Sequence, residues 1–204
     1  MPCKLHKHLF GGNPNIDILG EFNTVAGNAD FPSAEVVIIG ETHTSNNSEI
    51  AGLQLLQEYA KPGDLVLLEG RQRGSVYGAD DVVLLLEDGV KIQGWDDIPL
   101  RDESVANVRL LIALHDRIKE GKGDTEALEK VFWFVKGKTN ELTRRRDEIL
   151  LETILSEVEK NSGRIFVRAG TNHATSELVV EGLKKAGVKF VSLVPKNNEE
   201  DMTP

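Results

Sequence analysis

The chain has 204 residues, of which 40% are hydrophobic, and a formal net charge of −9 at pH 7. This length suits one domain with a genuine core, and the acidic balance argues against nucleic acid or anionic lipid as a partner. The single cysteine, Cys3, excludes an internal disulfide and a cysteine-based zinc site and fits a reducing compartment. Because the sequence shows no signal-like apolar core and no run of transmembrane length, we expect a cytoplasmic protein without a membrane partner.

The first 34 residues are dense in Gly, Asn and Pro and are predicted to be an N-terminal edge segment, with residues 16–19 as an edge strand. The histidines at positions 6 and 8 form an H-x-H pair, which we expect to be solvated so close to a chain end. Residues 35–195 are predicted to form a single α/β domain with a helical insertion at about 72–140. Residues 196–204 form a polar tail.

Apolar runs that alternate with helical periods predict the architecture. The strongest run is Val36-Val37-Ile38-Ile39, whose four β-branched residues leave no face for water, so it is predicted to be a central buried strand. The other runs extend the set of predicted strands, which lie at 35–40, 65–69, 90–94, 164–169 and 189–194. The expected fold class is α/β, with a central mostly parallel sheet, helices on both faces and a small helical insertion.

Helical periods predict four segments between the later strands: 79–88, 102–118, 124–135 and 139–160. In the second of these, Val105, Val108, Leu111 or Ile112, and His115 share one stripe. We interpret His115 as a core histidine with satisfied hydrogen bonds and not as a ligand, because no polar residue accompanies it on that stripe.

Three adjacent aromatic residues, Phe132-Trp133-Phe134, stand in the third helical segment. Since three consecutive positions cannot share one side of a helix, at least one should face a partner subunit or a ligand cavity. This favours a homodimer contact through Phe132–Phe134. The alternative is a helix that is simply covered on both sides.

Polar residues follow three of the predicted strands. Glu41 and His43 come directly after the central strand and, two positions apart, point to the same side, into the crevice beyond the strand ends. Glu69 ends the next strand, and a later strand closes on Gly170-Thr171-Asn172-His173, which repeats the Gly-x-x-His pattern of residues 40–43. These residues are therefore expected to gather at one edge of the sheet.

Arg146 occupies an apolar position of the last predicted helix, four residues after Leu142 and four before Leu150. Its guanidinium should reach inward, where burying an unpaired charge costs several kcal/mol. We therefore expect carboxylate partners for it, and Glu41 and Glu69 are the candidates.

Two imidazoles and two carboxylates suit zinc, manganese, cobalt or iron(II) as ligands. Such a metal lowers the pKa of a bound water and polarises a carbonyl. Without a metal, the same groups suit acid/base chemistry in which a carboxylate holds a histidine that acts as the base. A cluster kept only for structure is a third interpretation.

Taken in order, the Gly-Glu-Thr-His, the Leu-Leu-Glu ending at Glu69, the Arg-Asp-x-x-Leu from Arg146 and the second Gly-x-x-His resemble the EreA/ChaN-like superfamily. That group includes erythromycin esterases, the TraB/Tiki proteins and the haem-binding lipoprotein ChaN, and the resemblance covers roughly residues 16–194. It implies an α/β core with a polar centre at Glu41, His43, Glu69, Arg146 and His173.

What the resemblance implies for function is a hydrolase that cleaves an ester or amide bond in a small-molecule or peptide substrate, with or without a divalent metal (Zn, Mn, Co or Fe). The alternative that it leaves open is a haem- or metal-binding module without turnover. The chain between Glu69 and Arg146 is short for the helical insertions of erythromycin esterases, so a macrolide substrate is not expected.

Overall fold

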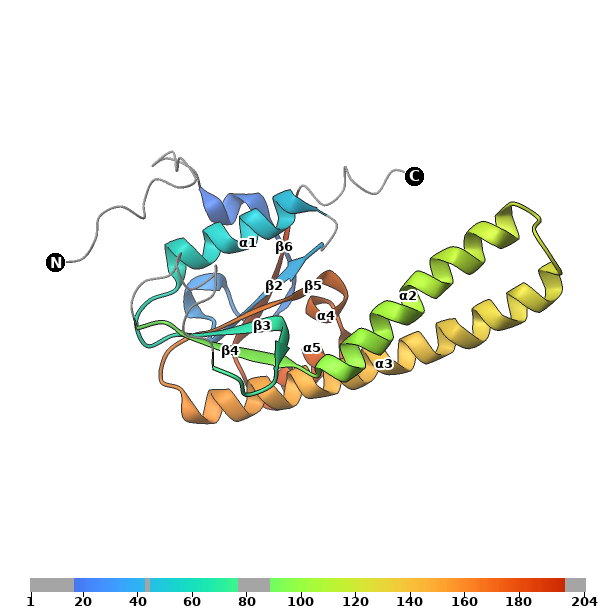
Figure 1. Cartoon of the computed structure of the whole chain (residues 1–204). Coiled ribbons are helices and arrows are strands. Elements are labelled where there is room, and N and C mark those ends of the chain that lie inside the picture. Colours follow the sequence, from blue (N-terminus) through green and yellow to red (C-terminus); the bar gives the residue numbers. More distant parts are fainter. Residues whose placement is uncertain (1–16, 43–44, 77–88, 197–204) are drawn as a thin grey trace.

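The computed structural model describes residues 17–42, 45–76 and 89–196 (Figure 1). The expected helix at 79–88, His43 and the His6–His8 pair lie outside the described residues. The described strands are β1 (Phe22–Gly27), β2 (Val36–Glu41), β3 (Leu65–Gln72), β4 (Lys91–Asp96), β5 (Ile165–Gly170) and β6 (Phe190–Pro195). They form one sheet in the order β1-β6-β2-β5-β3-β4.

The five predicted strands are confirmed as β2 to β6, and they are parallel to one another. The sixth, β1, runs antiparallel to β6 at the edge and was not predicted. The expected edge strand at residues 16–19 is wrong in its described part, because Ile18–Glu21 form the 3-10 turn η2. The Asp17 side chain accepts the N–H of Gly20 and so stabilises this turn in place of a strand.

Helices cover both faces of the sheet, as Figure 1 shows, and the α/β fold class is confirmed. These helices are α1 (Asn46–Tyr59), α2 (Ile98–Lys119), α3 (Thr125–Lys160), α4 (Thr171–Ala174) and α5 (Glu177–Lys185). Strand alternation divides the core between the two faces. Val36 and Ile38 of β2 pack with residues of α3 and α5, whereas Val37 and Ile39 pack with residues of α1.

Helix α3 is continuous over 36 residues, where the sequence predicted two separate helices at 124–135 and 139–160. Gly137 lies in the middle of it with ordinary helical geometry. The first part of α3 pairs with α2 in an antiparallel hairpin that projects from the body of the molecule (Figure 1). The second part of α3 returns along the sheet and packs on it through Leu150 and Ile154.

The interpretation of His115 as a core residue is wrong, because its side chain is 66% exposed. Helix α2 packs mainly on α3, and its buried residues are Ser104 and Leu114. The predicted stripe that includes Val105 and Val108 faces outward instead. Within the described ranges, no helix has the length and apolarity that crossing a bilayer requires.

Candidate functional site

A buried cluster of charged side chains lies where β3, β4 and α3 meet. Arg146 of α3 donates to Asp96 through Nε (3.0 Å to Oδ1) and Nη2 (2.8 Å to Oδ2), and to Glu69 Oε1 through Nη2 (2.6 Å). The second oxygen of Glu69 accepts the backbone N–H of Gly170 at 2.5 Å. Arg146 is therefore inward and paired with Glu69, and its other partner is Asp96, at the end of β4.

The electrostatics of this cluster keep Arg146 charged. Burial by itself lowers the pKa of the guanidinium, but the hydrogen bond to Asp96 and the negative charges of Glu69 and Asp96 outweigh it, so the pKa of Arg146 is raised. Three described carboxylates, those of Glu69, Asp96 and Asp147, lie within reach of Arg146 or His173. The cluster is thus richer in negative charge than one arginine neutralises.

His173 lies in the first turn after β5 and is 4% exposed. Its Nδ1 is 2.5 Å from Asp147 Oδ1, and its Nε2 is 3.7 Å from Glu69 Oε1. The second oxygen of Asp147 accepts the hydroxyl of Ser176 at 2.8 Å. A carboxylate at Nδ1 favours the tautomer with its proton there, which leaves Nε2 as the basic nitrogen on the side of Glu69.

Trp95 fixes the imidazole from another side. Its ring meets the ring of His173 edge to face, with centroids 5.4 Å apart and an interplanar angle of 77°. The indole Nε1–H of Trp95 donates to the carbonyl of Arg168 at 3.1 Å, so the tryptophan is itself tied to β5. His173 is therefore held in one orientation by the Asp147 carboxylate and by the ring of Trp95.

Glu41 does not belong to this cluster. It follows Val37 and Ile39 on the α1 face of β2, and both of its carboxylate oxygens accept hydrogen bonds from Arg168, each at 2.7 Å. Gly52 of α1 makes room for it, because a side chain at that position would overlap the Glu41 carboxylate. The predicted constellation is therefore divided. Glu69, Arg146 and His173 meet on the α3 face, Glu41 lies on the α1 face, and His43 is outside the described residues.

Three residues of these two groups were not placed in the site by sequence reasoning: Asp96, Asp147 and Arg168. The sequence did contain an indication for Asp147, since this residue directly follows Arg146 in the Arg-Asp pair. The sequence contained an indication for Arg168 as well, because this residue is the charged one inside the apolar run Ile165-Phe166-Val167-Arg168-Ala169. Asp96 stands beside Asp97, and the sequence does not show which of two adjacent carboxylates turns inward.

The described residues do not assemble the predicted metal-ligand set. No group of three or more His, Cys, Asp or Glu side chains in this part of the chain is arranged to hold a metal ion. The carboxylates of Glu41 and Glu69 are each engaged by an arginine, and Nδ1 of His173 is engaged by Asp147. A divalent cation at these oxygens would have to displace guanidinium groups.

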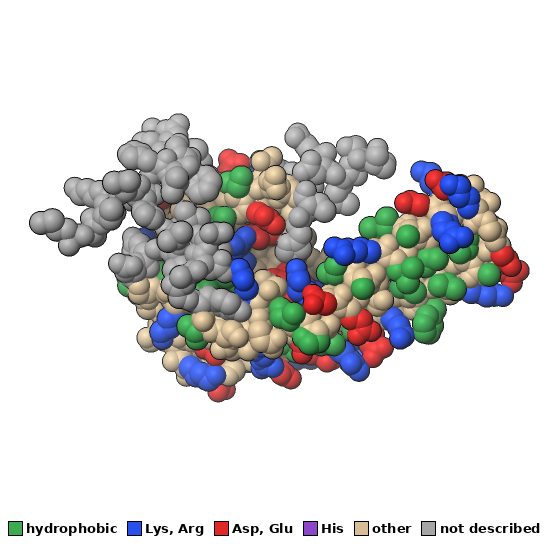
Figure 2. Space-filling view, in the orientation of Figure 1, with side chains coloured by type: hydrophobic (Ala, Val, Ile, Leu, Met, Phe, Trp, Pro, Cys, Tyr) green, Lys and Arg blue, Asp and Glu red, His purple; other side chains and the backbone are tan. Residues whose placement is uncertain are grey.

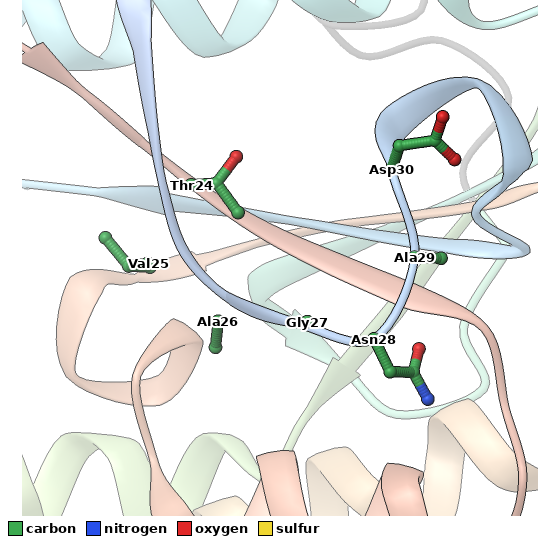
Figure 3. Close-up of a pocket in the computed structure, with 7 residues that line it drawn as sticks. All are labelled: Thr24, Val25, Ala26, Gly27, Asn28, Ala29 and Asp30. Carbon is green, nitrogen blue, oxygen red and sulfur yellow. The ribbon is translucent and has the colours of Figure 1, made fainter.

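Two surface hollows lie away from the charged cluster. One, of about 490 Å³, follows the bend of the chain through Thr24–Asp30 (Figure 3). The other, of about 450 Å³, lies between η2, α1 and the end of β6. None of the described candidate residues lines either of them.

No family model, curated protein or solved structure matches the chain.

Proposed function

We propose that this protein is a hydrolase that cleaves an ester or amide bond, with His173 as its base. The observation that carries the proposal is the Asp147–His173 contact of 2.5 Å, which leaves Nε2 of a fixed imidazole beside Glu69 at the carboxyl end of the sheet. A carboxylate that orients a histidine and stabilises its protonated form is the arrangement in which the histidine of a catalytic triad acts as a general base.

In the proposed reaction, Nε2 of His173 takes a proton from a water molecule as the water oxygen attacks the substrate carbonyl. Asp147 stabilises the imidazolium that forms. Collapse of the tetrahedral intermediate breaks the ester or amide bond, and Nε2–H returns its proton to the leaving alcohol or amine. Glu69, held by Arg146, accepts a hydrogen bond from the same water and so positions it.

The resemblance to the EreA/ChaN-like superfamily supports the same proposal, because three of the four motifs that carry it supply Glu69, Arg146, Asp147 and His173. A small-molecule or peptide substrate with a small acyl group is favoured, since the side chains of Glu69 and His173 are only 11% and 5% exposed. No step of the proposed reaction uses a metal ion.

The test is hydrolysis of p-nitrophenyl esters of increasing acyl length and of the matching p-nitroanilides, with the wild type and three variants. His173→Gln should lower turnover roughly 100- to 10,000-fold, the usual contribution of a general base. Asp147→Asn should lower it as well, because it removes the charge that orients and stabilises the imidazole. His115→Gln, at an exposed histidine on the hairpin, is the matched control and should leave turnover unchanged.

Equal turnover in the wild type and His173→Gln would overturn the proposal. So would a wild type that hydrolyses no substrate of the panel but binds haem, seen as a shift of the Soret band, with loss of that shift in His173→Gln. Circular dichroism of each variant confirms that lost turnover is not lost folding.

A further inference from the structure

The ion pair between Glu41 and Arg168 is a buried charged contact that the proposed reaction does not use. Figure 2 shows acidic and basic side chains next to one another in several places on the surface, and pairs exposed in this way contribute little to stability. The side chains of Arg168 and Glu41, in contrast, are only 13% and 4% exposed. A guanidinium that left its carboxylate here would stay in the interior without a counter-charge. Glu41 therefore fixes where the side chain of Arg168 lies.

The main chain of Arg168 lies where the pairing of β3 with β5 ends. Leu68 and Arg168 are the last partners in this parallel ladder. Beyond them, side chains take the place of backbone partners. The N–H of Gly170 donates to Oε2 of Glu69 at 2.5 Å, and the carbonyl of Arg168 accepts the indole N–H of Trp95 at 3.1 Å. Glu69 and Trp95 are thus both attached to the end of β5.

Trp95 connects the end of β5 to the base of the proposed reaction. Its ring meets the imidazole of His173 edge to face, with centroids 5.4 Å apart, and Cζ of Arg146 lies 5.7 Å from its centroid. Trp95 is fully buried, so its ring cannot shift without displacing a neighbour. His173 also stands only five residues after Arg168, on the chain that leaves β5. The end of β5 therefore locates the imidazole in two ways, through the chain and through the ring of Trp95.

We propose that the Glu41–Arg168 ion pair is a positioning pair for His173. It fixes the end of β5, from which Glu69, Trp95 and His173 take their places, although the pair itself lies on the other face of the sheet. This inference rests on the proposed hydrolase function. Because a reacting group that is misplaced by about 1 Å can lower the rate on the order of 100-fold, the pair should affect kcat and leave KM unchanged.

The first test compares kcat and KM on the p-nitrophenyl ester that the wild type hydrolyses fastest. Glu41→Gln keeps the size of the side chain but removes its charge, and Arg168→Lys keeps the charge but loses the two parallel hydrogen bonds. Each should lower kcat roughly 10- to 100-fold. Leu55→Ala, at a buried residue on the same α1 face, is the control. It should lower the melting temperature and leave kcat unchanged. An unchanged kcat in both ion-pair variants contradicts the proposal.

A double substitution tests the connection through Trp95. Trp95→Phe keeps an aromatic ring beside His173 but removes the N–H that the carbonyl of Arg168 accepts. If the ion pair acts through that carbonyl, Trp95→Phe combined with Glu41→Gln should lower kcat little more than the larger of the two single effects. Independent action, in which the two fold-changes in kcat multiply, would rule out this connection and with it the proposal.

Nitrogen NMR of the His173 imidazole tests the proposal without any turnover. The wild type should show one neutral tautomer, with the proton on Nδ1 toward Asp147, and His173→Gln identifies its signals. In Glu41→Gln these signals should shift or divide between two tautomers, whereas in Leu55→Ala they should not. A wild type that hydrolyses no ester but shows this response would refute the hydrolase function and keep the positioning pair. Unchanged signals in Glu41→Gln would remove the positioning pair, whatever the turnover of the wild type.

Discussion

Arg146 and Asp147 are consecutive in α3 and both are buried, yet different elements hold them. Arg146 binds the carboxylates of Glu69 and Asp96 at the strand ends, whereas Asp147 binds His173 and Ser176 beyond β5. Because consecutive helical residues point about 100° apart, this turn of α3 lies in the angle between the sheet and the α4–α5 segment. One helical turn thus supplies both a counter-charge and an orienting carboxylate.

Replacing Arg146 with leucine should destabilise the fold by about 3–5 kcal/mol, because Glu69 and Asp96 lose their buried counter-charge. Arg144→Leu is the matched control. That arginine is 73% exposed beside Glu148 and should contribute less than about 1 kcal/mol. Urea unfolding followed by circular dichroism measures both effects. Equal midpoints for the two variants would mean that the buried ion pairs add no net stability.

The stability that Arg146 provides should also be insensitive to alkali. The pKa of Arg146 is raised in the folded protein, so its stabilising charge is fully present below the ordinary arginine pKa and is lost only above the raised value. The difference in unfolding free energy between the wild type and Arg146→Leu should therefore stay constant between about pH 7 and pH 10. Urea unfolding at several pH values checks this, and a difference that shrinks across this range contradicts it.

Gly52→Ala should destabilise the protein by about 1–3 kcal/mol, because the added methyl overlaps the Glu41 carboxylate that pairs with Arg168. The same substitution in a Glu41→Ala background removes the overlap and should cost clearly less. A double-mutant cycle of unfolding free energies gives this coupling. If Gly52→Ala costs the same in both backgrounds, the carboxylate does not rest against α1.

Two buried polar atoms that lack a hydrogen-bond partner among the described residues make a matched pair: the hydroxyl of Thr171 and the side-chain nitrogen of Asn107. Thr171→Val and Asn107→Leu should each raise stability by about 1 kcal/mol, since each removes an unsatisfied polar group. Thr171 stands two positions before His173 in α4, so the two side chains point to different sides of this helix. Neither substitution should therefore change turnover under the proposed hydrolase function, and urea unfolding followed by circular dichroism measures the gain in stability. A loss of stability in either variant would mean that the polar atom has a partner that the substitution removes.

Chelation should leave the protein unchanged, since the described carboxylates of the site are bound to arginines. Incubation with EDTA is expected to alter neither the melting temperature nor ester turnover. The complementary measurement is calorimetric titration with cobalt at pH 7.5, on the wild type and on His173→Ala. Tight cobalt binding that disappears in His173→Ala would restore the metal interpretation of this site.

Most of the parallel core was predictable from apolar runs, which can be recognised without knowing the neighbouring strands. Strands β2 and β3 each open on four consecutive apolar residues, and β5 and β6 each contain one polar residue within the run. Strand β1 was not predictable, because Phe22–Gly27 is an edge strand with a single buried residue and an irregular register near Val25. The continuity of α3 was obscured by Gly137, whose cost to a helix is small enough for the rest of the helix to offset. Burial on the hairpin was misjudged for a related reason. A helix that packs on one other helix needs only a narrow seam, so Val105 and Val108 were free to face water.

The inward position of Arg146 was predictable because this charged residue stands at an apolar position of a helical stripe. The division of the site between two faces was not, because alternation gives the face of each residue only relative to its own strand. Assigning Glu41 to α1 and Glu69 to α3 requires the order and twist of the sheet. The partner of Glu41, Arg168, comes from a strand that is 127 residues away in sequence.

The continuity of α3 has a mechanical consequence. Phe134 and Arg146 are 12 positions apart on one helix, about 18 Å along its axis, with no proline or irregular turn between them to act as a hinge. A sideways force on the hairpin therefore tilts α3 as one rigid rod. The force is transmitted to the helical turn that holds Arg146 against Asp96. Whatever pulls on the hairpin pulls on that ion pair.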